Sequence, residues 1–332
     1  MWREVRRRWL VVGVLFAVLL AVLGPRLGAA GGPLHMEYMS YLPLTYIYYN
    51  AGGRARGCRF AGGGVVHSLR VSVVSAIHAH LVAPALCAAV VSGYRNGGVD
   101  QRVLKGAVLS SVGAPCGWLA MALCRQYRAT AATAALGYSL ALIVTPLSLV
   151  YICGRATIPH LGGVISTVCT TLTPFVLGAV GHKHGRPNGN SGGSANKLSA
   201  LLLLYVDCCG RFNEAEGSLY VGDVFITLLL VQDVAVSVVS WLAVSSGACC
   251  AYAWSGILGP DAAGLHTLLL CSVPKGLQHG LQSSLACTPS GLSALPGVFL
   301  SPAQALLVAV ITPDDDDDGG DSDAIDYQTL PQ

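Results

Sequence analysis

Charged residues are scarce in this sequence. Asp, Glu, Lys and Arg together make up only 11% of the 332 residues, whereas hydrophobic residues make up 53%. A soluble globular domain carries about 25% charged residues. The sequence also lacks HExxH, GxSxG and Walker-type motifs, which argues against the commonest metal, hydrolase and nucleotide sites. We therefore expect no enzyme, no cofactor and no nucleic-acid partner, and predict an integral membrane protein surrounded by the lipid bilayer.

Regularly spaced cysteines are missing as well. The twelve cysteines form no CxxC pair, and most of them lie inside apolar segments. A free cysteine packs there as a small hydrophobic residue. The sequence therefore indicates neither a disulfide framework nor a metal site.

Apolar runs, by contrast, recur along the whole chain. A hydrocarbon core about 30 Å thick needs about 17–25 helical residues. Runs bounded by charge, Gly or Pro predict ten crossings, at residues 9–24, 37–53, 71–93, 104–123, 130–152, 161–181, 197–212, 219–245, 260–286 and 291–312. The first run has a second interpretation, as a signal peptide cleaved after the alanines of LGAAGG. The fold class predicted is an all-α polytopic membrane protein with one transmembrane domain over residues 1–312.

The positive charges predict an orientation. With the N-terminus inside, the basic residues of the loops divide thirteen to six in favour of the cytoplasmic side. Both termini are therefore predicted to lie in the cytosol. Residues 182–197, rich in Gly, Ser and Asn, are predicted to form a flexible cytoplasmic loop. This loop separates a first repeat of about residues 9–152 from a second of about 161–312.

Two predicted crossings are interrupted in corresponding places. The fourth contains SSVGAPCG (Ser110 to Gly117), and the ninth contains SVPKGLQHG (Ser272 to Gly280). Irregular backbone at membrane depth persists where it lines a cavity, and paired interruptions point to a midplane substrate or ion site. Two ordinary proline kinks are the alternative. The candidate site residues are Gly113, Pro115, Gly117, Ser272, Pro274, Lys275, Gly276, Gln278 and His279.

Lys275 is the charge that the ninth interruption carries. A lysine at mid-membrane depth costs about 2.5–3.5 kcal/mol on insertion scales. It is expected either to bind an anionic substrate or to titrate and couple transport to protons. The alternative is a lysine that reaches an interface or neutralises an aspartate for packing. The candidate charge partners are Asp207, Asp223 and Asp233.

Several short motifs occur in a familiar order. They are RRRWLVVGV, GGPL, YYNAGG (Tyr48 to Gly53), LKG, VTP, TPFVLG (Thr173 to Gly178), SVPKGLQHG and SPAQALL (Ser301 to Leu307). On these motifs the chain resembles the bile acid:sodium symporter family. The resemblance implies ten helices in two inverted five-helix repeats, divided into a panel and a core, with broken helices four and nine crossing each other. It also implies an organic anion as the substrate, with sodium or a proton as the coupling ion.

The sequence departs from this family at the cation site. Sodium-coupled members hold the cation with hydroxyl and amide side chains on helices four and five and with a Glu and a Gln on helix nine. Here APCGWLAMA (Ala114 to Ala122) offers no Ser, Thr or Asn, and the comparable positions on helix five are Ala134 and Tyr138, beside Thr133 and Ser139. These departures count against sodium coupling. They favour a second interpretation that the resemblance carries, a non-transporting regulator of calcium influx with a role in calcium homeostasis and in the secretory pathway.

The acidic tail, residues 313–332, holds eight of the seventeen acidic residues and is predicted to be disordered in the cytosol. Tyr327 and Leu330 have the spacing of a tyrosine-based sorting signal that a clathrin adaptor binds. The sequence therefore predicts residence in Golgi, endoplasmic reticulum or endosomal membranes, with the plasma membrane as a further site. A solvated end without a signal is the alternative.

Overall fold

The computed structural model describes residues 9–29, 31–33, 35–55, 63–94, 100–112, 117–123, 128–153, 161–181, 191–216, 267–268, 270–271, 293 and 295–311. In these ranges all long regular elements are helical, which confirms the predicted all-α class for this part of the chain. The elements are α2 (Trp9–Leu23), α3 (Pro25–Gly28), α4 (Met36–Met39), α5 (Tyr41–Ala55), α6 (Gly63–Ile77), η1 (His78–Val82), α7 (Ala83–Tyr94), α8 (Gln101–Val112), α9 (Gly117–Leu123), α10 (Arg128–Cys153), α11 (Leu161–Thr170), α12 (Leu172–Gly181), α13 (Ser191–Glu216) and α17 (Leu295–Ile311).

Helices occupy eight of the ten ranges predicted as crossings. The range 219–245 and most of 260–286 lie outside the described residues. Within the described part, one uninterrupted helix, Arg70–Gly93, is long and apolar enough to cross a membrane by length and composition alone. Shorter apolar helical stretches accompany it at Trp9–Leu23, Ala131–Ala141, Ile165–Gly181 and Pro296–Val310. The helical character of these ranges is thus observed, whereas their number as membrane crossings stays a prediction.

The prediction of a flexible loop over residues 182–197 is wrong for its last seven residues. α13 begins at Ser191. Asn196 is buried, and its side-chain oxygen accepts a hydrogen bond of 3.0 Å from Asn50 Nδ2 on α5. The Lys197 ammonium lies 5.6 Å from the ring centre of Trp9 on α2. Because these contacts come from distant parts of the chain, composition alone did not indicate that this Gly- and Ser-rich stretch is helical.

The long helix from α6 to α7 contains one π turn. η1 lies between Ile77 and Ala83, which both have α-helical dihedrals. On one side of this turn α6 packs against α10, where Ser72 Oγ and Thr133 Oγ1 lie 3.1 Å apart and share a hydrogen bond. On the other side α7 packs against α8. His78, at the start of the π turn, is buried inside a continuous helix.

α5 and α12 cross with their backbones in contact. A Cβ on Gly52 would overlap the carbonyl oxygen of Phe175, and a Cβ on Gly178 would overlap the carbonyl oxygen of Tyr49. The contact is therefore reciprocal. Small residues permit this close approach between helices in membrane bundles. The motifs YYNAGG and TPFVLG thus meet in the most extensive helix contact of the described residues.

α2 and α13 form the second most extensive contact. Gly13 lies against Leu201, and Gly28 in α3 lies against Tyr205 and Cys209. Both sets of residue numbers rise together, so the two helices run parallel.

α8 and α17 are also parallel. A Cβ on Gly106 would overlap the carbonyl oxygen of Ser293, just before α17. Four residues further along both segments, a Cβ on Gly297 would lie 3.4 Å from Ser110 Oγ. The predicted fourth and tenth crossings therefore lie side by side in a fixed register.

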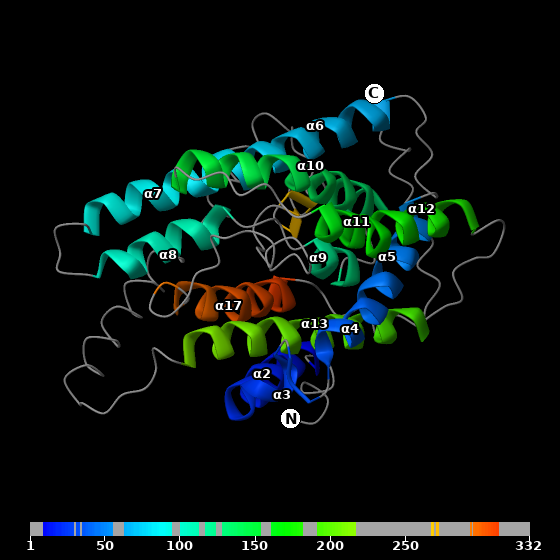
Figure 1. The fold of residues 1–332 in the computed structure, drawn as a ribbon. Coiled ribbons are helices and arrows are strands. Elements are labelled where there is room, and N and C mark those ends of the chain that lie inside the picture. The colour runs from blue at the N-terminus through cyan, green and yellow to red at the C-terminus, as the bar shows by residue number, and fades with distance from the viewer. Residues whose placement is uncertain are drawn as a thin grey trace.

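The bundle has α2 and α3 on one side and α6, α7 and α10 on the other, with α13 and α17 between them (Figure 1). Its core is formed where α5, α9 and α13 meet. The largest fully buried side chains there are Tyr48, Ile47, Met121, Leu203 and Leu204.

Candidate functional site

The predicted break in the fourth crossing lies between two helices. α8 ends at Val112 and α9 begins at Gly117. Gly113 and Pro115 lie outside the described residues. Gly117 is buried, and a Cβ on it would lie 3.3 Å from Tyr48 Oη and 3.4 Å from the Ala134 carbonyl oxygen. The first turn of α9 is therefore packed tightly against α5 and α10.

Aromatic rings fill the space beside Gly117. Tyr48 and Tyr138 are both buried, and their rings meet edge to face with centroids 5.7 Å apart. The structure thus brings Ala134 and Tyr138, the positions that the family comparison singled out on helix five, to the start of α9. At this point they present a backbone carbonyl oxygen and the Cβ of the tyrosine instead of short hydroxyl or amide side chains.

The neighbouring hydroxyls are engaged elsewhere. Thr133 shares its hydrogen bond with Ser72 on α6, and Ser139 donates to the Ala135 carbonyl oxygen at 2.8 Å within its own helix. Among the described residues, no group of three or more His, Cys, Asp or Glu side chains is placed to hold a metal ion. The described part of the site therefore offers few oxygen ligands for a cation.

The ninth crossing is described only at its beginning. Thr267, Leu268, Leu270 and Cys271 are helical and buried. Three groups of candidate residues lie outside the described residues. They are the rest of this crossing (Ser272, Pro274, Lys275, Gly276, Gln278 and His279), the aspartates of the eighth crossing (Asp223 and Asp233) and the sorting signal (Tyr327 and Leu330). Their roles stay predictions.

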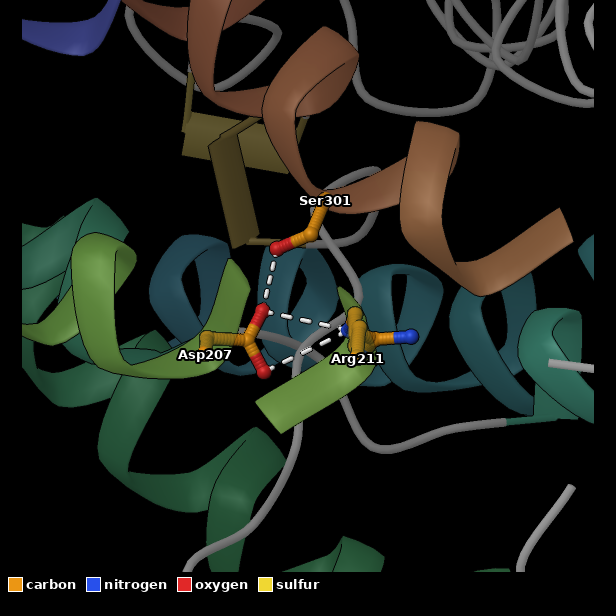
Figure 2. A network of polar contacts seen from close by, with 3 residues as sticks. All are labelled: Asp207, Arg211 and Ser301. Atoms are coloured by element: carbon orange, nitrogen blue, oxygen red, sulfur yellow. Dashed lines mark hydrogen bonds and ion pairs between the residues drawn. The ribbon is translucent and has the colours of Figure 1, made fainter. Parts of the chain in front are cut away.

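A buried ion pair within α13 is hydrogen-bonded to α17 (Figure 2). Asp207 is 3% exposed and Arg211 is 8% exposed. Arg211 Nε donates to both carboxylate oxygens, at 3.4 Å to Oδ1 and 3.3 Å to Oδ2. Ser301 Oγ on α17 donates to Oδ2 of the same carboxylate. Asp207 therefore has two partners on two helices, and Arg211 is its ion-pair partner among the described residues.

The spacing of this pair explains its geometry. Residues four apart lie on one face of a helix, so Asp207 and Arg211 point the same way from α13. Taking two charges out of water costs several kcal/mol per ion unless each charge is paired. The Ser301 hydroxyl adds a charge-assisted hydrogen bond, which is stronger than a neutral one. Removal of either partner alone is therefore expected to destabilise the fold.

Sequence reasoning missed Arg211 and Ser301. Arg211 is one of the six basic residues that the orientation prediction counts in non-cytoplasmic loops, and the structure instead places it inside α13, buried against α17. The i, i+4 spacing from Asp207 was a signal that could have identified the pair. Ser301 lies in the motif SPAQALL, but nothing local indicated that its hydroxyl meets a carboxylate ninety-four residues away.

A second cation contact, which is partly buried, supports α9. Arg54, in the last turn of α5, donates from Nη2 to the Met121 carbonyl oxygen at 2.6 Å. That carbonyl belongs to the last turn of α9, where unpaired carbonyls carry the negative end of the helix dipole. Arg54 thus holds the far end of the helix that begins at Gly117.

Comparison with characterised proteins finds relatives of this chain that share one name. No family model matches the chain. Sodium/bile acid cotransporter 7 of Danio rerio is 23% identical over 333 residues, which covers 93% of this chain and 94% of that protein. The protein of the same name from Mus musculus is 24% identical over 325 residues, covering 93% and 92%. This chain is similar to sodium/bile acid cotransporter 7.

The similarity to sodium/bile acid cotransporter 7 extends over nearly the whole chain. The Rattus norvegicus protein gives 24% identity over 327 residues and 93% of both chains. This confirms the resemblance to the bile acid:sodium symporter family that the short motifs indicated. The aligned length also includes residues that the structure does not describe.

Proposed function

We propose that the chain is an integral membrane secondary transporter for an organic anion, with ten crossings and both termini in the cytosol. The observation that carries this proposal is the direction of the helix pairs. Successive crossings alternate in direction, so crossings one and seven, and two and six, have to be parallel. α2 and α13 run parallel. α5 and α12 do too, since Thr45 donates to the Thr170 carbonyl oxygen and Gly52 lies against Phe175.

Two further pairs fit the same numbering. Crossings four and ten have to be parallel, and α8 and α17 are. Crossings seven and ten have to be antiparallel, and α13 and α17 are, because Asp207 meets Ser301 whereas Arg211, further along α13, meets Gly297. A single missed or surplus crossing between the members of any of these pairs would reverse its direction.

The contact pattern supports two inverted repeats. The symmetry between two such repeats relates crossing one to crossing six and crossing two to crossing seven. The contact between crossings two and six therefore corresponds to the contact between crossings seven and one. These correspond to α5 with α12 and α13 with α2, the two most extensive helix contacts described. Likewise, α5 packs on α10 and α13 packs on α17. These are the contact of crossing two with crossing five and the contact of crossing seven with crossing ten, and the same symmetry relates them.

In this proposal the substrate binds where crossings four and nine meet. The fourth crossing contributes the stretch between Val112 and Gly117, and the ninth contributes Pro274, Lys275 and Gly276. Lys275 supplies a fixed positive charge or a titrating group, and His279, one helical turn further, is a second candidate for carrying a proton. The buried position of Gly117 and the helix ends on both sides of the predicted break support this location.

A proton is the coupling ion that we favour over sodium. Sodium prefers several oxygen ligands, and the described atoms nearest to a Cβ on Gly117 include only two oxygens, the Tyr48 hydroxyl and the Ala134 carbonyl, beside the Tyr138 methylene group. An ammonium at Lys275 would supply the charge that a bound cation supplies elsewhere in the family. This part of the proposal rests on the aromatic packing of Tyr48 and Tyr138.

The test is flux in liposomes that contain the purified protein. Because the relatives are named for bile acids, taurocholate is the first substrate, and sodium and pH gradients are imposed separately. Uptake driven by the pH gradient is expected, and replacement of Lys275 by Met should abolish the pH dependence. Uptake that follows only the sodium gradient would contradict proton coupling, and absence of uptake under every gradient would contradict transport of this substrate class.

The second candidate is a non-transporting regulator of calcium influx. The observation that favours it is the same replacement of short oxygen ligands by aromatic rings beside Gly117. The measurement is cytosolic calcium in cells that lack the protein, rescued by the wild type or by Lys275→Ala. Equal rescue by both would show that the crossing site is not needed for control of calcium.

Residence in internal membranes belongs to the same proposal. The support is the spacing of Tyr327 and Leu330 within an acidic tail. Replacing Tyr327 by Ala in a tagged copy should raise surface biotinylation. An unchanged distribution would leave the tail without a sorting role and would remove the expected adaptor contact.

A further inference from the structure

Arg211 uses only one of its three nitrogens in the network with Asp207. Nε donates to the carboxylate, and the rest of the guanidinium points away from it (Figure 2). In the part of the chain that the structure describes, neither terminal nitrogen has a hydrogen-bond partner. A guanidinium has five N–H donors, so the four on Nη1 and Nη2 are left for a ligand, and two of them point in parallel from the edge between these two nitrogens. The side chain is 9% exposed, so most of it lies in the interior of the bundle.

Two other helices meet this edge. Gly297 on α17 lies directly against Arg211 Nη1, and a Cβ at this position would overlap that nitrogen. The same point is 3.4 Å from Ser110 Oγ on α8. Ser110 Oγ is itself buried and has no hydrogen-bond partner among the described residues. A fixed cation and a free hydroxyl from two different helices therefore converge on one place.

We propose that the terminal nitrogens of Arg211 and the hydroxyl of Ser110 bind an oxyanion group, the carboxylate, sulfate or sulfonate end of an organic anion. A guanidinium edge matches two oxygens of such a group with two parallel hydrogen bonds, which an ammonium does not do. Ser110 donates a further hydrogen bond to the same group. This inference rests on the proposed function for the identity of the ligand, but not for the presence of the site.

Asp207 and Ser301 position Arg211 in this site. The carboxylate binds the Nε edge and the hydroxyl of Ser301 fixes the carboxylate, so the guanidinium plane is held before a ligand arrives. An oxyanion at the terminal nitrogens is nearer to the guanidinium than to Asp207. Attraction therefore exceeds repulsion, because charge–charge energy falls with distance. The site lies one turn before the predicted break of the fourth crossing, next to the proposed central cavity.

The first experiment measures binding in detergent, without transport. Purified full-length protein is titrated with sodium sulfate, sodium phosphate and sodium taurocholate against sodium chloride at equal ionic strength, and the thermal unfolding midpoint is recorded. A saturable rise in the midpoint with at least one oxyanion is expected. A response to sulfate and phosphate alone identifies a free inorganic oxyanion as the ligand, and a response to taurocholate identifies an organic one. No saturable rise with any of the three overturns the proposal.

The variants assign the response to the site. Ser110→Ala should weaken the apparent affinity about tenfold, the usual effect of one hydrogen bond to a charged group. Ser111→Ala is the matched control, since the next hydroxyl on α8 already donates to the Val108 carbonyl oxygen at 2.6 Å. Equal affinities of these two variants would overturn the role of Ser110.

The arginine is tested without leaving a buried charge unpaired. The double variant Asp207→Asn with Arg211→Gln keeps a polar pair and is expected to fold and to lose the oxyanion response. A response that persists in this folded variant overturns the proposal. Binding in detergent without flux in liposomes would contradict the transport function and leave the site intact. Flux that is unchanged in both Ser110→Ala and the double variant would contradict the site and leave transport intact.

Discussion

The crossing of α5 and α12 predicts that Gly178→Ala destabilises the protein. A Cβ at this position would overlap the Tyr49 carbonyl oxygen and would lie 2.9 Å from the Tyr49 carbonyl carbon and 3.2 Å from Gly53 N. All three atoms belong to the backbone of α5, so no change of side-chain rotamer relieves the overlap. The two helices have to move apart.

The size of the effect follows from two opposing terms. Overpacking a well-packed contact costs about 1–3 kcal/mol. Ala is a better helix former than Gly by about 1 kcal/mol, which offsets part of that cost. We therefore expect a net loss of about 1–2 kcal/mol. Gly52→Ala should behave in the same way, since its Cβ would lie 2.8 Å from the Phe175 carbonyl carbon. The double variant should lose less than the sum, because one separation of the helices relieves both overlaps.

The assay is the thermal unfolding midpoint in detergent, where 1 kcal/mol corresponds to roughly 2 °C for a chain of this size. Gly181→Ala, on the same helix, is the matched control because its Cβ would lie 3.7 Å from Tyr49 Oη, an ordinary contact. Gly210→Ala meets nothing within 4 Å and should be stabilising by up to about 1 kcal/mol. Equal midpoints for Gly178→Ala and Gly181→Ala would refute the close crossing.

Three further predictions concern polar contacts between helices. Asp207→Asn should lower the free energy of unfolding by about 3–5 kcal/mol, because it leaves the charge of Arg211 buried without its partner, and a midpoint within 2 °C of wild type would contradict this. Arg54→Gln should cost about 1.5–3 kcal/mol through loss of a charged hydrogen bond to α9, measured as faster thermal inactivation. A double-mutant cycle with Asn50→Ala and Asn196→Ala should give a coupling of about 0.5–1.5 kcal/mol, whereas additive effects would show that the hydrogen bond contributes nothing.

Much of the helical architecture could be predicted from the sequence. A long apolar run between clusters of charged residues, Gly or Pro can satisfy its backbone hydrogen bonds at membrane depth by forming a helix. The ranges of α2, α10 and α17 were therefore predicted to within a few residues. The glycines of YYNAGG and TPFVLG were visible as motifs. That Gly52 and Gly178 face each other was not predictable, because contact between distant helices is set by the whole bundle.

The candidate site shows where sequence reasoning ends. The break after Ser110 was predicted from Gly and Pro spacing, and α8 and α9 lie on its two sides. Arg211 was assigned to a loop because a charge near the end of an apolar run normally lies at the membrane surface. Its burial depends on Asp207 one turn earlier and on the missing side chain at Gly297. The spacing of Asp207 and Arg211 is visible in the sequence, whereas the contact with Gly297 is seen only in the structure.

The π turn at His78–Val82 has a consequence for how α6 and α7 are oriented. A π turn holds one residue more than an α turn, and each residue rotates a helix by about 100°. Each residue of α7 therefore points about 100° away from the direction that a regular α-helix continued from α6 would give it, and it is in this shifted orientation that α7 packs against α8. A deletion of one residue within η1 would restore the regular α repeat without shortening the span much. It would turn one half of the helix away from its neighbour, so the angular offset, rather than the length, is what this segment contributes to the bundle.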